Sequence, residues 1–191
     1  MFCNYPSLVD YLNNLKDKCP ENIFKENQRC SQLPITIKIK KEEKYNNACK
    51  LAELALKPCS RNKERHSAVE NFMLVNDSST IACEVPIWFW EKNLNTGICG
   101  HIDLLQIRQR KIYILDFKPE ANRENDNKVA SQLYLYASGL SFRTSVPLKE
   151  FRCAWFDDTV YYEFSPIESE IRMKGATPKS WKKNNHILYP E

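Results

Sequence analysis

The sequence predicts an α/β protein built around one mixed β-sheet that helices flank, with a helical extension at its N-terminal end. Three observations support this prediction. Apolar residues recur at helical spacing over residues 6–17, 42–57 and about 60–75, follow strand patterns over residues 80–118, and return to helical spacing over residues 126–142, before two more strand-like runs. This order of helix, three-strand meander, helix and strand pair is typical of a single sheet covered by helices.

The composition is that of a folded protein. Hydrophobic residues make up 42% of the 191 residues, too many for a disordered chain, and the length suits one domain. The 28 Lys and Arg residues against 24 Asp and Glu residues leave a net charge of +4, a weak indication of an anionic partner. No apolar run reaches about 18 residues. No secretory signal precedes the first helix, so we expect a cytoplasmic protein that does not cross a membrane.

The first part of the chain predicts mainly helices. Residues 6–17 have an amphipathic helical pattern, and residues 35–40 alternate between apolar and polar side chains as a half-buried strand does. Residues 42–57 are again helical in pattern and end at Pro58, which cannot continue a helix. Ser60 is a suitable N-cap for the next helix, which we expect to end near residue 75.

Strand patterns dominate the second part. In chain order, we expect strands at 80–90, 98–108 and 112–118, a helix at 126–142, and strands at 150–156 and 159–164. A turn is expected at residues 93–97. The chain thus divides into a mostly helical N-terminal extension, a core and a basic tail, at residues 1–59, 60–165 and 166–191.

Eight cysteines are scattered along the chain, and no two of them form a CxxC pair. Structural zinc and iron–sulfur sites usually show close ligand pairs, so the sequence favours reduced thiols that pack as small apolar side chains. A chain of this length with four Trp and nine Phe residues has no need of disulfides. One alternative stays open, in which cysteines between residues 19 and 59 assemble a zinc site in space.

Two acidic residues and a lysine stand at the end of the expected meander. Residues 112–118 are apolar up to Asp116, so this strand should be central in the sheet. Asp116 and Lys118 share one face because side chains alternate along a strand, whereas Phe117 points to the other face. Asp103 lies on the preceding strand, where an antiparallel hairpin brings it opposite Asp116. Two carboxylates this close repel each other, and a divalent cation relieves the repulsion.

This arrangement suits the hydrolysis of a phosphodiester. Asp103, Asp116 and the backbone carbonyl of Phe117 would hold Mg²⁺ or Mn²⁺, and Lys118 would orient a water molecule or contact the phosphate. An ion pair that closes the sheet is the alternative, because a D-x-K tripeptide recurs by chance. The segment Gly100-His101-Ile102-Asp103 upstream, at hairpin distance, favours the functional interpretation.

Three motifs in this order resemble the PD-(D/E)XK nuclease superfamily. They are Gly100-His101-Ile102-Asp103, Asp116-Phe117-Lys118, and a Q-x-x-x-Y pair on the next helix, Gln132 and Tyr136. This last pair is similar to the RecB-like branch, which includes the CRISPR-associated RecB-type exonucleases. The resemblance covers about residues 60–165. It implies a restriction-endonuclease-like fold and cleavage of DNA with Mg²⁺ or Mn²⁺.

The resemblance also implies roles for individual residues. Asp103 and Asp116 would be metal ligands and Lys118 the catalytic lysine, while Gln132 and Tyr136 would contact the substrate or the lysine. Tyr136 also fits the apolar stripe of its helix, so a place in the core stays open for it.

Members of the family carry a metal-binding His or a Glu on the helix that precedes the sheet. His66 and Glu70 lie one helical turn apart, and either can take that place, although a lone helical His is more often a surface residue. Glu84 resembles a lesser motif of the family. It either hydrogen-bonds near the site or lies on an edge strand, because Pro86 weakens the pairing that a central strand needs. The iron–sulfur cysteines of the CRISPR-associated branch are absent, since only Cys153 follows the catalytic helix.

DNA is the partner that the resemblance implies. Basic residues around the expected site would contact phosphates or form a solvated surface; they are Arg108, Arg110, Lys111, Lys118, Arg123 and Lys128. Nothing resembles a base-reading module, so we expect selection by shape or strand ends. The leading hypothesis is a metal-dependent DNA nuclease, and the alternative is a nucleic-acid-binding subunit with a nuclease-like fold and no turnover. The sequence specifies neither a homo-oligomer nor a recruiting protein.

Overall fold

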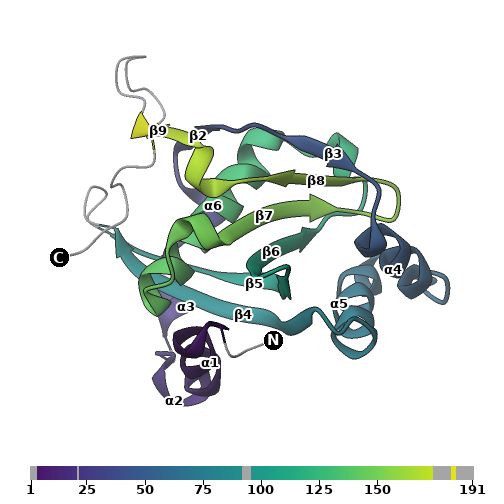
Figure 1. Cartoon of the computed structure of the whole chain (residues 1–191), viewed down its shortest axis with the longest axis horizontal. Coiled ribbons are helices and arrows are strands. Elements are labelled where there is room, and N and C mark those ends of the chain that lie inside the picture. Colours follow the sequence, from purple (N-terminus) through teal and green to yellow (C-terminus); the bar gives the residue numbers. More distant parts are fainter. Residues whose placement is uncertain (1–3, 21, 92–95, 174–181, 184–191) are drawn as a thin grey trace.

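Strand β6 (Lys111–Phe117) lies inside the sheet, between β5 (Thr96–Arg108) and β7 (Phe151–Phe156), as its apolar residues on both faces predict. The structure is a computed structural model that describes residues 4–20, 22–91, 96–173 and 182–183. Within these residues, helices flank a seven-stranded sheet of parallel and antiparallel strands (Figure 1). The expected α/β class with one mixed central sheet is therefore confirmed.

The order of strands in the sheet brings the ends of β6 and β7 together. β4 (Thr80–Glu91), β5 and β6 form the expected antiparallel meander, and β8 (Tyr161–Phe164) pairs β7 antiparallel. β6 and β7 pair in parallel, which requires a crossover, and α6 (Asp126–Thr144) supplies it. Because the pair is parallel, both strands end at the same edge of the sheet, where Asp116 stands beside Trp155.

Hydrophobic side chains cover both faces of the sheet. α6 packs on one face with Ile112 and Ile114 of β6. α4 (Asn47–Leu56) and α5 (Arg65–Asn76) pack on the other face with Leu115 and Phe117. Figure 1 shows α4 and α5 next to each other beside the start of β4. Side chains of β6 alternate between these faces, so Asp116 belongs to the α6 face.

The first 59 residues contain strands as well as helices. The helices are α1 (Pro6–Asn13), α2 (Leu15–Lys18), α3 (Ile23–Glu26) and α4. The strands are β1 (Gln28–Arg29), β2 (Ile35–Lys38) and β3 (Glu42–Lys44). β1 and β3 pair β5 and β8 of the main sheet, while β2 forms a small sheet with β9 (Glu170–Met173) and β10 (Lys182–Lys183). The segment expected to be mostly helical thus completes both sheets.

Some boundaries differ from those expected, for local reasons. The helix expected over 6–17 is interrupted at Asn14, whose side-chain amide donates a hydrogen bond to the Asp10 carbonyl and competes with the helical backbone. The helix expected over 42–57 begins only after Asn46, which caps α4 by accepting a hydrogen bond from the Ala48 N–H. Ser60 does not cap α5, which follows a 3-10 turn and begins after Glu64.

Two expectations fall largely outside the described residues. The turn expected at residues 93–97 is described only at Thr96 and Gly97, which begin β5, and the basic tail is described only to Met173 and at β10. None of the helices in the described ranges is both long enough and apolar enough to cross a membrane.

Candidate metal centre

The candidate site lies where β5 and β6 separate. Their pairing ends with Leu104 opposite Leu115, and further along β5 the neighbouring strand is β1. Asp103 and Asp116 come directly after this last pair, so they stand across from each other at the fork, as the hairpin register predicts. Both side chains are buried: that of Asp116 is 2% exposed and that of Asp103 is 13% exposed.

The backbone is irregular at the same level of the sheet. Glu84 of β4 stands opposite Asp103 in the strand register, and its φ of 50° lies in the left-handed region that a Glu rarely adopts. On β5, Ile102 packs on the α6 face and Leu104 on the opposite face, although residues two apart in a regular strand share a face. The alternation therefore breaks at Asp103. Strained backbone of this kind is concentrated at functional sites.

Helix α5 brings a histidine and a third carboxylate to the fork. The His66 Nδ1 atom lies 3.2 Å from Glu70 Oε1, and its Nε2 atom lies 3.3 Å from Asp103 Oδ2. The edge of the imidazole meets the fully buried ring of Phe117, with the ring centroids 5.7 Å apart. One ligand atom from each of His66, Glu70 and Asp103 lies within 4.8 Å of the others, which is compact enough to hold one metal ion.

Four carboxylate oxygens of this centre are buried and have no donor in regular hydrogen-bond geometry among the described residues. They are Glu70 Oε1, Asp103 Oδ2 and both Asp116 oxygens. His66 and Lys118 approach three of these atoms within ion-pair distance, but not with hydrogen-bond geometry. Buried carboxylates without partners are costly, and hard divalent cations prefer carboxylate oxygens as ligands. The donor set therefore fits such a cation.

The carboxyl groups hold their protons tightly when no cation is bound. Burial, followed by repulsion from Glu84 and Asp116, raises the pKa of Glu70 to about 7. Burial and the neighbouring Asp116 also raise the pKa of Asp103, far above its usual range. Burial has the opposite effect on His66, whose pKa is lowered, so its imidazole is neutral near pH 7. Neutral imidazole and ionised carboxylates are the forms that bind a metal, so binding would displace protons.

We expect a divalent cation to stabilise the protein more at about pH 8 than at about pH 5.5. The Glu70 carboxyl binds its proton more tightly in the folded protein than in the unfolded chain. The stabilisation that comes from this bound proton is fully present below pH 4.5 and is lost as the pH rises through about 7. A cation replaces the proton in the upper range, and at a hundred times its Kd adds about 2.7 kcal/mol. Thermal melts with Mn²⁺ and with EDTA measure the effect. An equal increase in Tm at both pH values would contradict the assignment.

Lys118 places a fixed positive charge beside the two aspartates. Its Nζ atom lies 2.8 Å from Asp116 Oδ1, and its side chain is 23% exposed. The backbone N–H of Lys118 donates to the Phe156 carbonyl, which ties the end of β6 to β7. Burial lowers the pKa of Lys118, but Asp116 and Asp103 outweigh burial, so the pKa is raised and the ammonium form persists. Asp116 and Lys118 thus share a face, as strand alternation predicts.

Helix α6 meets the centre through the predicted Gln132 and Tyr136 pair. The Gln132 side-chain amide donates a hydrogen bond of 2.9 Å to the Tyr136 hydroxyl. The Tyr136 ring is buried against Gly100, and burial raises the pKa of its hydroxyl, with Asp116 and Asp103 as smaller causes. Tyr136 is therefore both a core residue and a neighbour of the acidic centre. Gly100 of the first motif and Tyr136 of the Q-x-x-x-Y motif are thus in direct contact.

We expect Gly100→Ala to lower the free energy of unfolding by about 1–3 kcal/mol, the usual cost of overpacking a core. A Cβ atom at this position would lie 2.4 Å from Tyr136 Cε1, so the ring would have to move. In a Tyr136→Leu background the same substitution should cost less. Chemical denaturation of the two single variants and the double variant gives the coupling energy. Additive losses would contradict the contact.

Part of the predicted basic set is engaged within the fold. The Arg108 guanidinium lies 4.0 Å from the centre of the Tyr113 ring and donates to the Tyr161 hydroxyl. Lys111 forms a 2.8 Å ion pair with Glu150. These contacts stabilise the two ends of the β5–β6 hairpin turn. A role in binding phosphates stays a prediction for the basic residues named above.

The seven cysteines among the described residues are free thiols. Burial raises the pKa values of Cys30, Cys99 and Cys153, which pack in the core on the α6 face. In the described part of the chain, the group of side chains close enough to bind a metal contains no cysteine. The alternative of a zinc site between residues 19 and 59 thus gains no support from how these residues are placed.

No protein-family model and no curated protein matches the sequence. A functional assignment must therefore come from the fold and from the chemistry of the acidic centre.

Proposed function

We propose that the protein is a metal-dependent DNA nuclease with a restriction-endonuclease-like fold, of the RecB-like branch of the PD-(D/E)XK superfamily. The observation that carries the proposal is the set of buried carboxylate oxygens without hydrogen-bond partners, beside the Lys118 ammonium. A purely structural ion pair accounts for Asp116 and Lys118 alone. It does not account for Asp103, Glu70 and His66 gathered at the same point.

In the proposed site, His66, Asp103, Asp116 and the Phe117 carbonyl hold Mg²⁺ or Mn²⁺, and Glu70 lies beside them. The bound cation would act as a Lewis acid that polarises the phosphate and lowers the pKa of a water molecule bound to it. The protein contributes a rigid cradle, because β5, β6 and α5 each fix their ligands by packing in the core.

The remaining residues act on the substrate directly. Lys118 presents a permanent positive charge where negative charge develops on the phosphate. Glu70 places a buried carboxylate beside the proposed cation, where it can accept a proton from water. Gln132 donates one amide hydrogen to Tyr136, which leaves a second one to orient a phosphate oxygen.

A cleavage assay tests the proposal. Labelled single-stranded, duplex, flap and circular DNA are incubated with the purified protein and Mg²⁺, Mn²⁺ or EDTA. We expect cleavage of at least one substrate with a cation and none with EDTA. A circle that stays intact while its linear form is degraded would establish dependence on strand ends. Binding of DNA without cleavage under every condition would overturn the proposal in favour of a nuclease-like binding subunit.

A further inference from the structure

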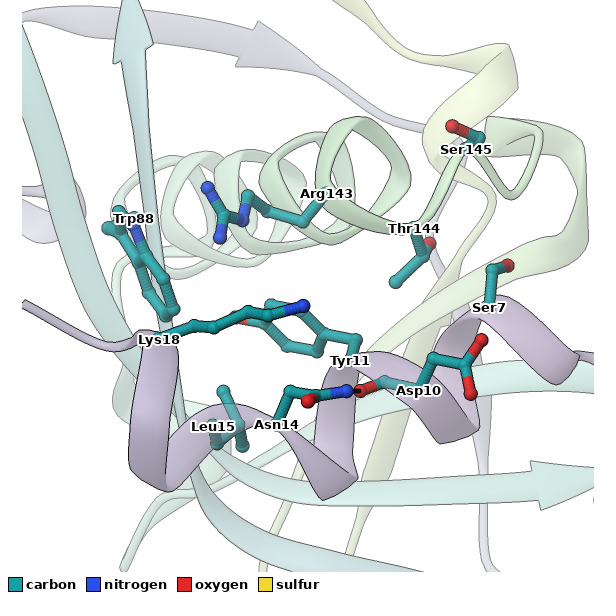
Figure 2. Close-up of a pocket in the computed structure, with 10 residues that line it drawn as sticks. All are labelled: Ser7, Asp10, Tyr11, Asn14, Leu15, Lys18, Trp88, Arg143, Thr144 and Ser145. Carbon is teal, nitrogen blue, oxygen red and sulfur yellow. Dashed lines mark hydrogen bonds between the residues drawn. The ribbon is translucent and has the colours of Figure 1, made fainter.

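A pocket of about 280 Å³ lies between the N-terminal helices and the C-terminal end of α6 (Figure 2). α1 and α2 form one wall, and Arg143 to Ser145 form the other. Trp88 of β4 closes one side. None of these residues belongs to the acidic centre, and the sequence patterns did not predict the pocket.

Arg143 is held in the pocket by aromatic rings rather than by acidic residues. Its guanidinium carbon lies 4.2 Å from the centre of the Trp88 ring and 5.9 Å from that of Tyr11. Both rings are buried, and the Tyr11 hydroxyl donates a 2.6 Å hydrogen bond to the Pro86 carbonyl. Within the described residues, the Arg143 side chain makes no ion pair and no hydrogen bond. A stacked guanidinium of this kind is oriented in advance, with its N–H donors available to an anion.

A second cation reaches into the same space. Figure 2 shows the Lys18 side chain extending across the pocket between Trp88 and Tyr11. Lys18 likewise has no ion-pair partner among the residues with described positions. The one carboxylate of the lining, that of Asp10, lies at the end of the pocket away from the Arg143 guanidinium (Figure 2). The end formed by Arg143 and Lys18 is therefore positively charged, and Arg143 has the geometry to bind a phosphate with two hydrogen bonds.

Helix α6 connects this pocket to the acidic centre. Arg143 follows Tyr136 by seven residues, which places it two turns further along the same helical face, about 10 Å away. Between them, Gly139 lets α6 lie directly on β4, since a Cβ there would meet the Phe89 ring at 2.6 Å. The helix thus holds Arg143 and Tyr136 at a fixed separation along its axis.

We propose that the pocket of Arg143 and Lys18 binds a backbone phosphate of the nucleic-acid strand on which the acidic centre acts. This assignment rests on the proposed function, whose substrate supplies the phosphate. The pocket gives the protein a second point of attachment on the strand, which sets the direction in which the strand crosses the centre.

Binding of a labelled single-stranded oligonucleotide in EDTA tests the assignment independently of cleavage. Affinity is measured over a series of salt concentrations for the native protein and for Arg143→Gln and Lys18→Ala. Each variant should bind several-fold more weakly, and loss of one phosphate contact should reduce the salt slope by about 0.7. Lys18 is exposed, so its variant does not endanger the fold. Lys57→Ala is the matched control, because Lys57 is 63% exposed just after α4, which packs on the opposite face of the sheet.

The outcomes separate the two proposals. Unchanged affinity and salt slope in both Arg143→Gln and Lys18→Ala would overturn the assignment. Inorganic phosphate provides a second arm: if it raises the Tm of the native protein but not of Arg143→Gln, while the oligonucleotide slopes stay equal, the pocket binds free phosphate and the strand assignment is wrong. A native protein whose binding depends on Arg143 but which cleaves no substrate contradicts the proposed nuclease activity and leaves the phosphate pocket standing.

Discussion

Replacing Asp116 with asparagine should abolish cleavage and, at the same time, remove the stabilisation of the protein by a divalent cation. Both Asp116 oxygens are buried, Asp103 and Glu70 stand nearby, and the Lys118 ammonium lies 2.8 Å from Asp116 Oδ1. Asparagine removes one negative charge from this cluster without changing its shape. We expect at least about a thousandfold loss of cleavage rate, because a ligand of the proposed cation is gone.

Two measurements on this variant separate folding from cation binding. In EDTA the Tm should be lower than that of the native protein, because Lys118 loses the carboxylate that lies 2.8 Å from its ammonium. With Mn²⁺ the increase in Tm seen for the native protein should be largely absent. Asp116→Ala should also abolish cleavage but leaves a cavity, so its Tm is less informative. Glu53→Gln is the matched control, because this carboxylate is 52% exposed on α4 and should affect neither measurement. Full activity in Asp116→Asn would refute the site.

The raised pKa values identify what the centre costs the fold. Two strands and a helix bring three carboxyl groups together in a buried place. Burial and mutual repulsion raise the pKa values of Glu70 and Asp103, so the folded state without a cation is stable only with bound protons. Natural proteins retain an unfavourable arrangement of this kind mainly at functional sites, where activity requires it.

Sequence patterns predicted the parts of the fold that depend on local periodicity. β6 is apolar on both faces and lies inside the sheet, and the hairpin register places Asp103 across from Asp116. These features follow from alternation along two neighbouring strands and the length of one short turn. His66 and Glu70 were also predicted to share a helical face, and the structure brings both to the fork.

Features that depend on distant contacts were not predictable in this way. β1 and β3 are two and three residues long, and each is a strand only because β5 or β8 offers an unpaired edge. The positive φ of Glu84 has no signal in the sequence, because glutamate rarely adopts it. The stack of Arg143 on Trp88 joins residues 55 positions apart (143 − 88) on different elements. One signal was available: Arg143 continues the helical face of Gln132 and Tyr136.

Substituting Lys118 with methionine should remove cleavage but keep the cation. Methionine preserves much of the unbranched side chain that is 23% exposed beside β6, so the fold should tolerate it. The ammonium is expected to stabilise charge on the reacting phosphate, and loss of such a group lowers kcat by about a hundredfold to a thousandfold. The measurements are kcat and KM on the best substrate, together with the increase in Tm caused by Mn²⁺.

The two measurements decide between two roles for the lysine. If Lys118 acts on the phosphate, the increase in Tm with Mn²⁺ should persist or grow, because removing a positive charge 2.8 Å from Asp116 makes the centre more attractive to a cation. If Lys118 only neutralises Asp116 as a structural ion pair, its loss should lower the Tm in EDTA and leave kcat near the native value with Mn²⁺ bound. Loss of kcat with an undiminished response to Mn²⁺ therefore assigns catalysis to the lysine and cation binding to the carboxylates, which a structural ion pair cannot produce.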